Sequence, residues 1–278
     1  SDAKQAPARQ AAASKTKAPP KKQSAATLWL SIGGIVTVLG LASIFVMGGK
    51  SEPAVRVQPL SASPVDAPFL AQVAAAPAAR QVELVKQKIE ALNGTKVTAE
   101  PTITGEKVTG LRLFKTDDTE GPTPDVSPFA ALKDLDSLRI EYLNPTDISC
   151  LRGLKLVNLT VWGGKFTDVS VLQSFPLKTL SLKQISVSDF SVLKGKAIQR
   201  LDLEWCDRLS DLSFVKGMPL QYLFVPKTKV RDLSPIAGSP LIELVCDPEA
   251  KLDPALLASI PTLKTINLKP VSEWAGGS

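Results

Sequence analysis

The stretch that decides the fold is D-L-S-F-V-K-G-M-P-L-Q-Y-L-F-V-P-K-T-K-V-R-D-L-S-P-I-A-G-S-P-L-I-E-L, residues 211–244. It contains one pattern twice: Asp, an apolar residue and Ser, followed nine positions after the Asp by L-x-x-L-x-L or a close variant. The acidic residue recurs at intervals of 21 or 22, at Asp125, Asp147, Asp168, Asp189, Asp211, Asp232 and Asp253. A unit this short cannot bury an apolar side alone, so the pattern predicts stacked repeats.

Each unit is expected to contribute one short strand. The strand patterns are Leu135/Leu138/Ile140, Leu156/Leu159/Val161, Leu177/Leu180/Leu182, Ile198/Leu201/Leu203, Leu220/Leu223/Val225, Leu241/Leu244/Cys246 and Leu263/Ile266/Leu268, with Val108/Leu111/Leu113 as an irregular eighth copy. A period of 20–29 residues is typical of leucine-rich repeats. We therefore expect an α/β leucine-rich-repeat solenoid with a parallel sheet roughly 35 Å long. Its inward column should hold Leu138, Leu159, Leu180, Leu201 and Leu223.

The column of Asp residues invites an acid–base or metal interpretation, but helix capping explains it better. In Asp125-Val126-Ser127-Pro128 and Asp232-Leu233-Ser234-Pro235 the Ser-Pro pair matches an N-cap followed by proline at the first helical position. We expect Asp and Ser together to satisfy backbone N–H groups of each returning segment. Asp117, Asp118 and Glu120 lack the spacing of a calcium loop, which favours a solvated loop.

Many leucine-rich repeats carry Asn or another polar residue at the ninth position, where it ties down the turn. Here that position holds Gly164, Ile185, Cys206 and Thr228, so the ladder is incomplete, and the backbone at Gly164 and Ile185 needs other partners or water. Cys246 falls on an inward strand position and is interpreted as a small buried apolar residue rather than a reactive thiol.

The run 25–47 contains 23 residues without a charge, enough for a helix of about 35 Å that crosses a hydrocarbon layer of roughly 30 Å. A signal peptide is the main alternative, but its apolar region should be shorter. Six Lys or Arg precede the run, and only Lys50 and Arg56 follow it closely. We expect a single-pass inner-membrane protein with a cytoplasmic amino terminus and extracytoplasmic repeats. Because the chain begins with Ser1, it is either processed or a piece of a longer polypeptide.

The remaining segments complete the expected organisation. Residues 1–24 form a basic disordered tail, and residues 48–77 a Pro/Ala-rich linker. Residues 78–124 are expected to form an N-terminal cap, with a helix over 78–92 and a hairpin of strands 96–104 and 107–115. Repeats fill 125–252, and 253–278 form a C-terminal cap and tail.

Composition excludes several classes of function. The chain has no His and only three Cys, without a CxxC pair, which removes the common catalytic triads and structural zinc sites. Residues 1–24 hold six basic residues against one acidic, a net +5, whereas the other 254 residues hold 27 against 26, a net +1. We therefore expect no nucleic-acid partner, no cofactor, no metal and no enzymatic activity of this chain, and an autonomous hydrolase has little support.

The units over 211–230 and 232–244 resemble the bacterial leucine-rich repeats of the D-L-S-P-L-K-G-M-P-L type, and residues 241–270 are similar to their terminal cap. The resemblance covers about residues 81–278. It implies an array that is often the C-terminal, extracytoplasmic part of a membrane-anchored Ser/Thr protein kinase. The chain itself contains no H-R-D, D-F-G or glycine-rich kinase motif, so a kinase domain would lie upstream.

Partner binding is expected on the outward-facing strand positions, which line the concave surface of such a solenoid. Phe224 and Val245 occupy the same position in adjacent units, and Tyr222 lies two residues along the strand, so they should form an apolar patch with a charged rim. The predicted contact residues for a protein or peptide are Trp162, Arg200, Tyr222, Phe224, Glu243 and Val245. The alternative is that these aromatics are scattered, or are covered by the tail around Trp274.

Overall fold

The computed structural model describes residues 65–116, 124–250 and 252–274. The chain divides into two units, Ser1–Met47 and Gly48–Ser278, and every described residue belongs to the second. The basic tail, the expected membrane span at 25–47, most of the expected linker and the acidic loop at Asp117–Glu120 lie outside the described residues. No helix of the part that is described has the length and apolar character that a membrane span requires.

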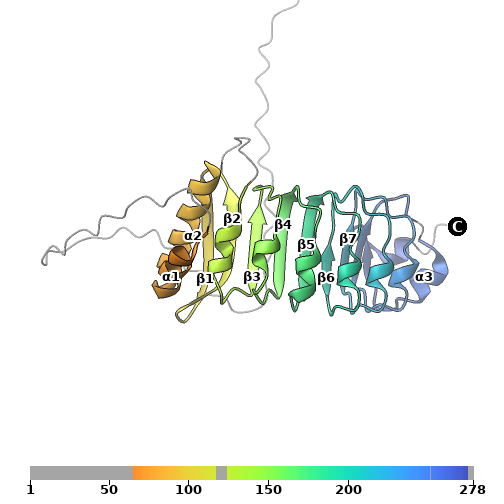
Figure 1. The fold of residues 1–278 in the computed structure, drawn as a ribbon. Helices are drawn as coiled ribbons and strands as arrows, with labels where there is room; N and C mark the ends of the chain where they lie inside the picture. Colours follow the sequence, from red (N-terminus) through yellow and green to blue (C-terminus); the bar gives the residue numbers. More distant parts are fainter. Residues whose placement is uncertain (1–64, 117–123, 251, 275–278) are drawn as a thin grey trace, which may run out of the picture. The chain divides into compact units, whose positions relative to one another are not determined.

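The centre of the fold is one sheet of ten strands in which each strand lies beside the next along the chain (Figure 1). The strands are β1 (Val97–Thr104), β2 (Lys107–Lys115), β3 (Ser137–Glu141), β4 (Asn158–Gly164), β5 (Thr179–Ile185), β6 (Arg200–Asp202), β7 (Tyr222–Val225), β8 (Glu243–Cys246), β9 (Thr265–Ile266) and β10 (Lys269–Pro270). Pairing is parallel from β2 to β9 and antiparallel at both ends.

The strand register confirms the expected column of inward leucines. Leu138 pairs with Leu159, Leu159 with Leu180, Leu180 with Leu201 and Leu201 with Leu223, and all five are buried. Leu111 extends the column at one end, and Leu244 and Ile266 extend it at the other. The 21- or 22-residue period therefore builds a leucine-rich-repeat solenoid whose core runs its whole length.

Short 3-10 turns return the chain from the end of one strand to the start of the next. They are η1 (Ser127–Ala131), η2 (Ser149–Leu151), η3 (Ser170–Ser174), η4 (Ser191–Leu193), η5 (Ser213–Val215) and η6 (Ser234–Ile236). In each of these units the Asp two residues before the turn accepts a hydrogen bond from the backbone N–H of the Ser, at 2.7–2.8 Å.

The structure corrects the predicted role of the serine hydroxyl in this capping. The hydroxyls of Ser149, Ser213 and Ser234 donate back to the other oxygen of the Asp, rather than serving the turn as N-caps. In the last unit Asp253 accepts from the N–H of Ala255 and begins α3 (Pro254–Ala258), which is followed by η7 (Val271–Glu273) after the last strand. The column of carboxylates is thus used in local turns.

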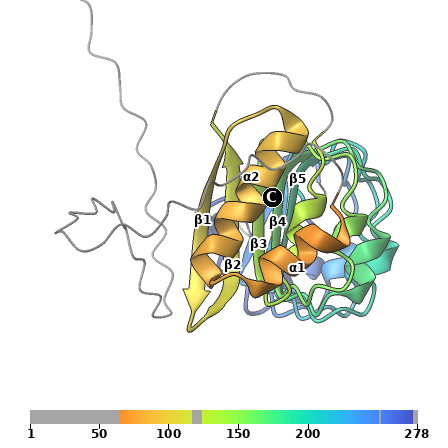
Figure 2. The same cartoon turned by 60° about the vertical axis from the view of Figure 1, so that its left-hand side comes forward.

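Two helices and an antiparallel pair, β1 and β2, precede the repeats (Figure 2). The expected helix is α2 (Ala78–Asn93), which ends at Gly94 with a φ of 60°. The helix α1 (Ala67–Ala75) falls inside the segment expected to be linker, and the linker boundary at residue 77 was wrong. Asp66 caps α1 by accepting from the N–H of Phe69, and Phe69 is buried in the core, so this Ala-rich segment gains enough contact to fold.

The ninth position of the repeats is filled by different means in successive units. Thr228 donates to the carbonyl of Val225 at 2.8 Å, and Cys206 donates through sulfur to the carbonyl of Leu182 at 3.1 Å. Gly164 lies instead against the buried ring of Phe166: a Cβ there would lie 2.5 Å from the ring. An aromatic ring therefore occupies the space beside Gly164.

The two outermost strands of the sheet are β1 and β10. Each contains a proline, Pro101 in β1 and Pro270 in β10.

Candidate protein-binding face

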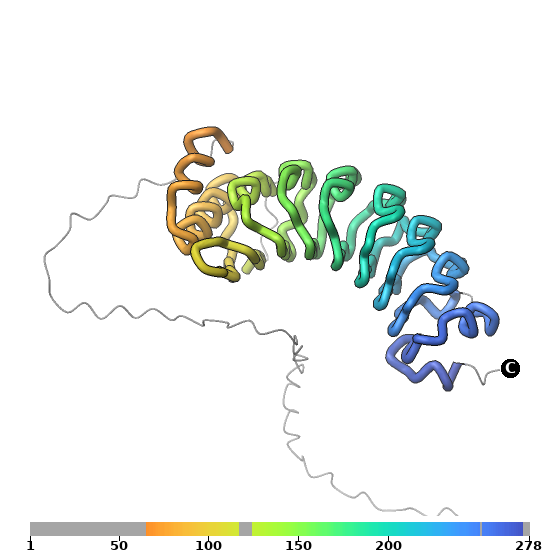
Figure 3. The backbone as a smooth tube through the Cα atoms, turned by 90° about the horizontal axis from the view of Figure 1, so that it is seen from below, coloured from red at the N-terminus to blue at the C-terminus, as the bar shows by residue number. Residues whose placement is uncertain are grey.

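The candidate site is the side of the sheet that faces away from the core. We call it the open face, and it comprises the side chains that alternate with the buried leucines of β2 to β8. Figure 3 shows the repeats as successive coils, with the strands along one side and the short turns along the other. Because the strands are in register, equivalent residues of neighbouring units form rows across the face.

Five of the six predicted contact residues come together on β6, β7 and β8. Phe224 pairs in register with Val245, and Tyr222 lies between Arg200 and Glu243. All five are half-buried. We call Tyr222, Phe224 and Val245 the Phe224 patch.

Arg200 lies over both rings of this patch. The guanidinium carbon is 4.6 Å from the ring centroid of Phe224 and 5.1 Å from that of Tyr222. A guanidinium held over aromatic faces keeps its N–H groups at the ring edges, where a ligand can reach them. The patch therefore combines an apolar surface with an oriented cation.

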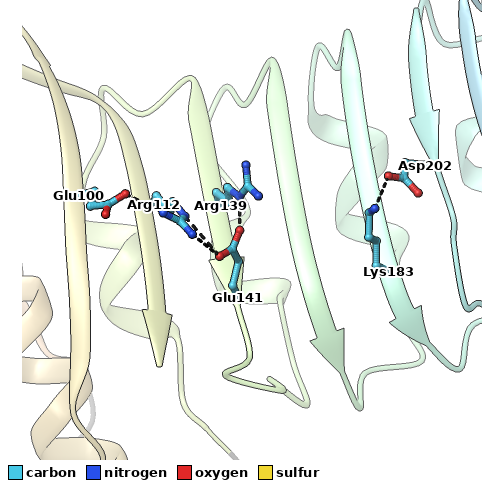
Figure 4. Close-up of polar contacts among 6 residues, drawn as sticks. All are labelled: Glu100, Arg112, Arg139, Glu141, Lys183 and Asp202. Atoms are coloured by element: carbon cyan, nitrogen blue, oxygen red, sulfur yellow. Dashed lines mark hydrogen bonds and ion pairs between the residues drawn. The ribbon is translucent and has the colours of Figure 1, made fainter. Parts of the chain in front are cut away.

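The amino-terminal end of the open face is organised around a buried carboxylate (Figure 4). Glu141 accepts from Arg112 at 2.8 Å and also from Arg139, and it is only 3% exposed. Burial alone would raise the pKa of Glu141, but the hydrogen bonds from the two arginines outweigh it and lower that pKa. Arg112 also pairs with Glu100 at 2.9 Å and lies over the ring of Phe114.

A second network lies between this cluster and the Phe224 patch. Lys183 contacts Asp202 and Glu204, each at 2.9 Å, as Figure 4 shows for Asp202. Burial works to lower the pKa of Lys183, but the hydrogen bonds to the two carboxylates prevail, and the pKa is raised. Both networks hold side chains in place on the open face.

The sixth predicted residue, Trp162, lies on β4, three strands from Phe224, and so does not join the patch. It is not isolated, because the ring of Tyr142 lies 4.7 Å from its ring and the ammonium of Lys183 lies 5.9 Å away. Sequence reasoning missed Tyr142, which is 48% exposed, and Trp205, which is 55% exposed. Each lies two residues after the last apolar residue of a strand pattern, Ile140 or Leu203, and has a φ of 62°. An aromatic at this turn position is the signal that could have identified them.

The tail does not form a ring contact with the patch in the described part of the chain. Trp274 follows η7 and packs against the core beyond the last strand. The ring contacts of the described residues are Tyr142 with Trp162 and Phe190 with Phe214.

Two kinds of reactive group were sought among the described residues, metal-ligand clusters and activated thiols. Among them no group of three His, Cys, Asp or Glu side chains is placed to hold a metal ion. Burial raises the pKa of the Cys150 and Cys206 thiols to about 12 and that of Cys246 to about 11, which opposes formation of a nucleophilic thiolate. The open face offers aromatic rings and fixed charges, which are the components of a protein-binding surface.

This arrangement defines the chain as a leucine-rich-repeat protein. Similar solved structures include an internalin (inlF) from Listeria monocytogenes, with 31% identity over 57% of this chain and 46% of that chain and a TM-score of 0.46. Internalin C2 from Listeria monocytogenes shares 23% identity over 57% of this chain and 80% of that chain, with a TM-score of 0.43. The chain thus spans just under half the length of the first. No protein-family model and no curated protein matches.

Proposed function

We propose that this chain is a membrane-anchored, non-catalytic module that binds a protein or peptide on its open face. The observation that carries the proposal is the Phe224 patch, where Phe224, Tyr222 and Val245 meet on adjacent strands beside Arg200. Contact surfaces between proteins commonly centre on aromatic residues and arginine, surrounded by polar groups.

The rigidity of the sheet supports this function. The patch rests on a continuous core in which Leu223 and Leu244 are fully buried directly beneath it. Side chains that are already held in place lose little conformational freedom when a partner binds. A preorganised patch of this kind can give useful affinity from a small contact area.

The proposal is tested by selecting binders from a displayed library of random peptides on the full chain, solubilised in mild detergent. Replacing Tyr222 and Phe224 with Ala should lower the affinity for the selected peptides by at least tenfold, because central aromatic contacts often contribute about 2 kcal/mol or more each. Thermal unfolding should change little, because both side chains are half-buried on the open face.

The matched control is Leu268→Ala, which removes an apolar side chain that is 78% exposed and lies beyond the last parallel strand. This variant should bind the peptides like the wild-type chain. If the double variant binds as well as wild type, the open face around Phe224 is not the binding site.

Membrane anchoring is the second part of the proposal, and it rests on the uncharged run at residues 25–47 and the six basic residues before it. Deleting residues 25–47 should move the expressed chain from the alkali-washed membrane fraction to the soluble fraction. A protease added outside spheroplasts should cut the repeats of the intact chain. Repeats that stay protected would overturn the proposed extracytoplasmic location.

An alternative is that this module is the extracytoplasmic region of a receptor-like Ser/Thr protein kinase. The resemblance of residues 211–244 to repeats of the D-L-S-P-L-K-G-M-P-L type favours it. The sequence of the gene upstream of Ser1 tests this directly: a kinase domain with H-R-D and D-F-G motifs supports it, and a stop codon close upstream refutes it.

A further inference from the structure

The charged side chains of the open face are almost all paired with one another. Arg112 and Arg139 are bound to Glu141, and Lys183 is bound to Asp202 and Glu204. Asp247 accepts hydrogen bonds from the N–H groups of Lys227 and Thr228. The face therefore satisfies most of its own charges, and a charge that has no protein partner is available to a ligand.

Two such charges lie on either side of Tyr222. Within the described ranges, the guanidinium of Arg200 and the carboxylate of Glu243 form no ion pair and no side-chain hydrogen bond. Tyr222 pairs in register with Arg200 on one side and with Glu243 on the other. The two charged residues are thus separated by two strand spacings, about 10 Å between backbones.

The nearby rings hold Arg200 in place without satisfying its N–H groups. Its guanidinium lies over Phe224 and Tyr222, and a cation–π contact leaves the donors at the edge of the group available. A planar guanidinium that is already oriented matches a carboxylate through two parallel hydrogen bonds. The Phe224 patch beside it would accommodate a bulky apolar side chain.

We propose that the open face binds an extended protein segment that carries an acidic side chain next to a bulky apolar one, with a basic side chain about three residues away from the acidic one. The carboxylate pairs with Arg200, the apolar side chain packs on Phe224 and Val245, and the basic group pairs with Glu243. Three residues of extended chain span about 10 Å, which matches the separation of the two strands. This inference rests on the proposed function and specifies its partner.

The carboxylate at Glu243 favours a peptide over a polyanion such as a nucleic acid. A phosphate backbone would also pair with Arg200, but it would bring further negative charge towards Glu243, and towards Asp247 just beyond the other end of β8. A segment with one charge of each sign complements both Arg200 and Glu243.

Selection from the random peptide library on the full chain tests the inference through sequence preference. We expect enriched peptides to contain Asp or Glu adjacent to Phe, Leu, Ile, Trp or Tyr, often with Lys or Arg about three residues away. Arg200→Glu should lower the affinity for these peptides about tenfold or more, as measured by fluorescence anisotropy, because hydrogen bonds between charged partners are stronger than those between neutral groups. The same selection on the Arg200→Glu variant should enrich peptides with Lys or Arg instead.

The matched control is Arg152→Glu, which makes the same change in charge on an exposed residue at the end of η2, away from the strands. It should change peptide affinity less than twofold. Arg200→Gln removes the charge without reversing it and keeps the test decisive if Arg200→Glu unfolds, as judged by thermal unfolding.

The outcomes separate this inference from the proposed function. Peptides that need Tyr222 and Phe224, show no acidic preference and bind equally well to the Arg200 variants would overturn the inference and leave the binding site in place. Peptides that are insensitive to Tyr222 and Phe224 would overturn the proposed function itself. If the wild-type chain selects single-stranded nucleic acid and Arg200→Gln abolishes that binding, Arg200 belongs to a nucleic-acid site and the proposal of a peptide ligand is refuted.

Discussion

Substituting Gly164 with Ala tests how tightly the ninth position of the repeat is packed. Gly164 ends β4 and pairs with Ile185 on β5. A Cβ at this position would lie 2.5 Å and 2.9 Å from two atoms of the Phe166 ring and 3.2 Å from a methyl group of Ile185. Phe166 and Ile185 are both buried, so neither can move into solvent to relieve the overlap.

The expected loss in the free energy of unfolding follows from these contacts. Overpacking a core by one methyl group costs about 1–3 kcal/mol, and two short contacts on a buried ring place Gly164→Ala at the upper end, about 3 kcal/mol. Gly217→Ala is the matched control, because a Cβ there meets no atom within 4 Å and only the φ of 77° is unfavourable. Its expected loss is about 1 kcal/mol, the cost of a left-handed conformation less the gain from a stiffer unfolded chain.

Urea unfolding monitored by circular dichroism measures both losses. A double-mutant cycle with Phe166→Leu isolates the contact, because the smaller side chain should relieve the overlap and make the double variant more stable than the sum of the single losses by about 1 kcal/mol or more. Additive losses, or a Gly164→Ala loss no larger than that of Gly217→Ala, would refute the packing argument.

Three further predictions concern the core, the buried carboxylate and the thiols. Leu180→Ala should lose about 3–5 kcal/mol in urea unfolding, because the side chain is fully buried between Leu159 and Leu201; a loss under 1.5 kcal/mol would show that the repeats do not share one core. Glu141 has a lowered pKa in the folded state, so its contribution is present above its ordinary pKa of 4.5 and is lost as pH falls through the folded value. Glu141→Gln should therefore be less stable than wild type in thermal unfolding at pH 7, and the difference in stability between the two should narrow below pH 4.5. A difference that stays constant with pH would contradict the lowered pKa of Glu141. Cys206 should react with iodoacetamide at pH 8 only after unfolding in urea, because burial raises its pKa to about 12, and rapid labelling of the folded chain at this residue would disprove it.

The repeat was predictable because it rests on a strict period of apolar residues. The position of Leu180 relative to Asp168 recurs in unit after unit, so the register of the sheet followed from counting residues. The helix α1 was not predictable in this way, because its Ala-rich segment lacks a strong apolar face and folds through the contacts of Phe69 and Val73 with the rest of the core.

The candidate site was predictable in its backbone positions but not in its side-chain contacts. Alternation along the strands placed Tyr222, Phe224 and Val245 together. The stacking of Arg200 on the rings depends on rotamers. The exposure of Tyr142 depends on a left-handed backbone at a residue other than glycine, which the period of apolar residues does not reveal.

The prolines in the two outermost strands bear on how this sheet ends. A strand edge with an unbroken row of N–H donors is a template on which another chain can add itself, and that is how ordered aggregates grow. Pro101 in β1 and Pro270 in β10 each remove a donor from such a row. A solenoid of similar units could otherwise add copies of itself at either end. The two prolines therefore oppose end-to-end polymerisation of the chain.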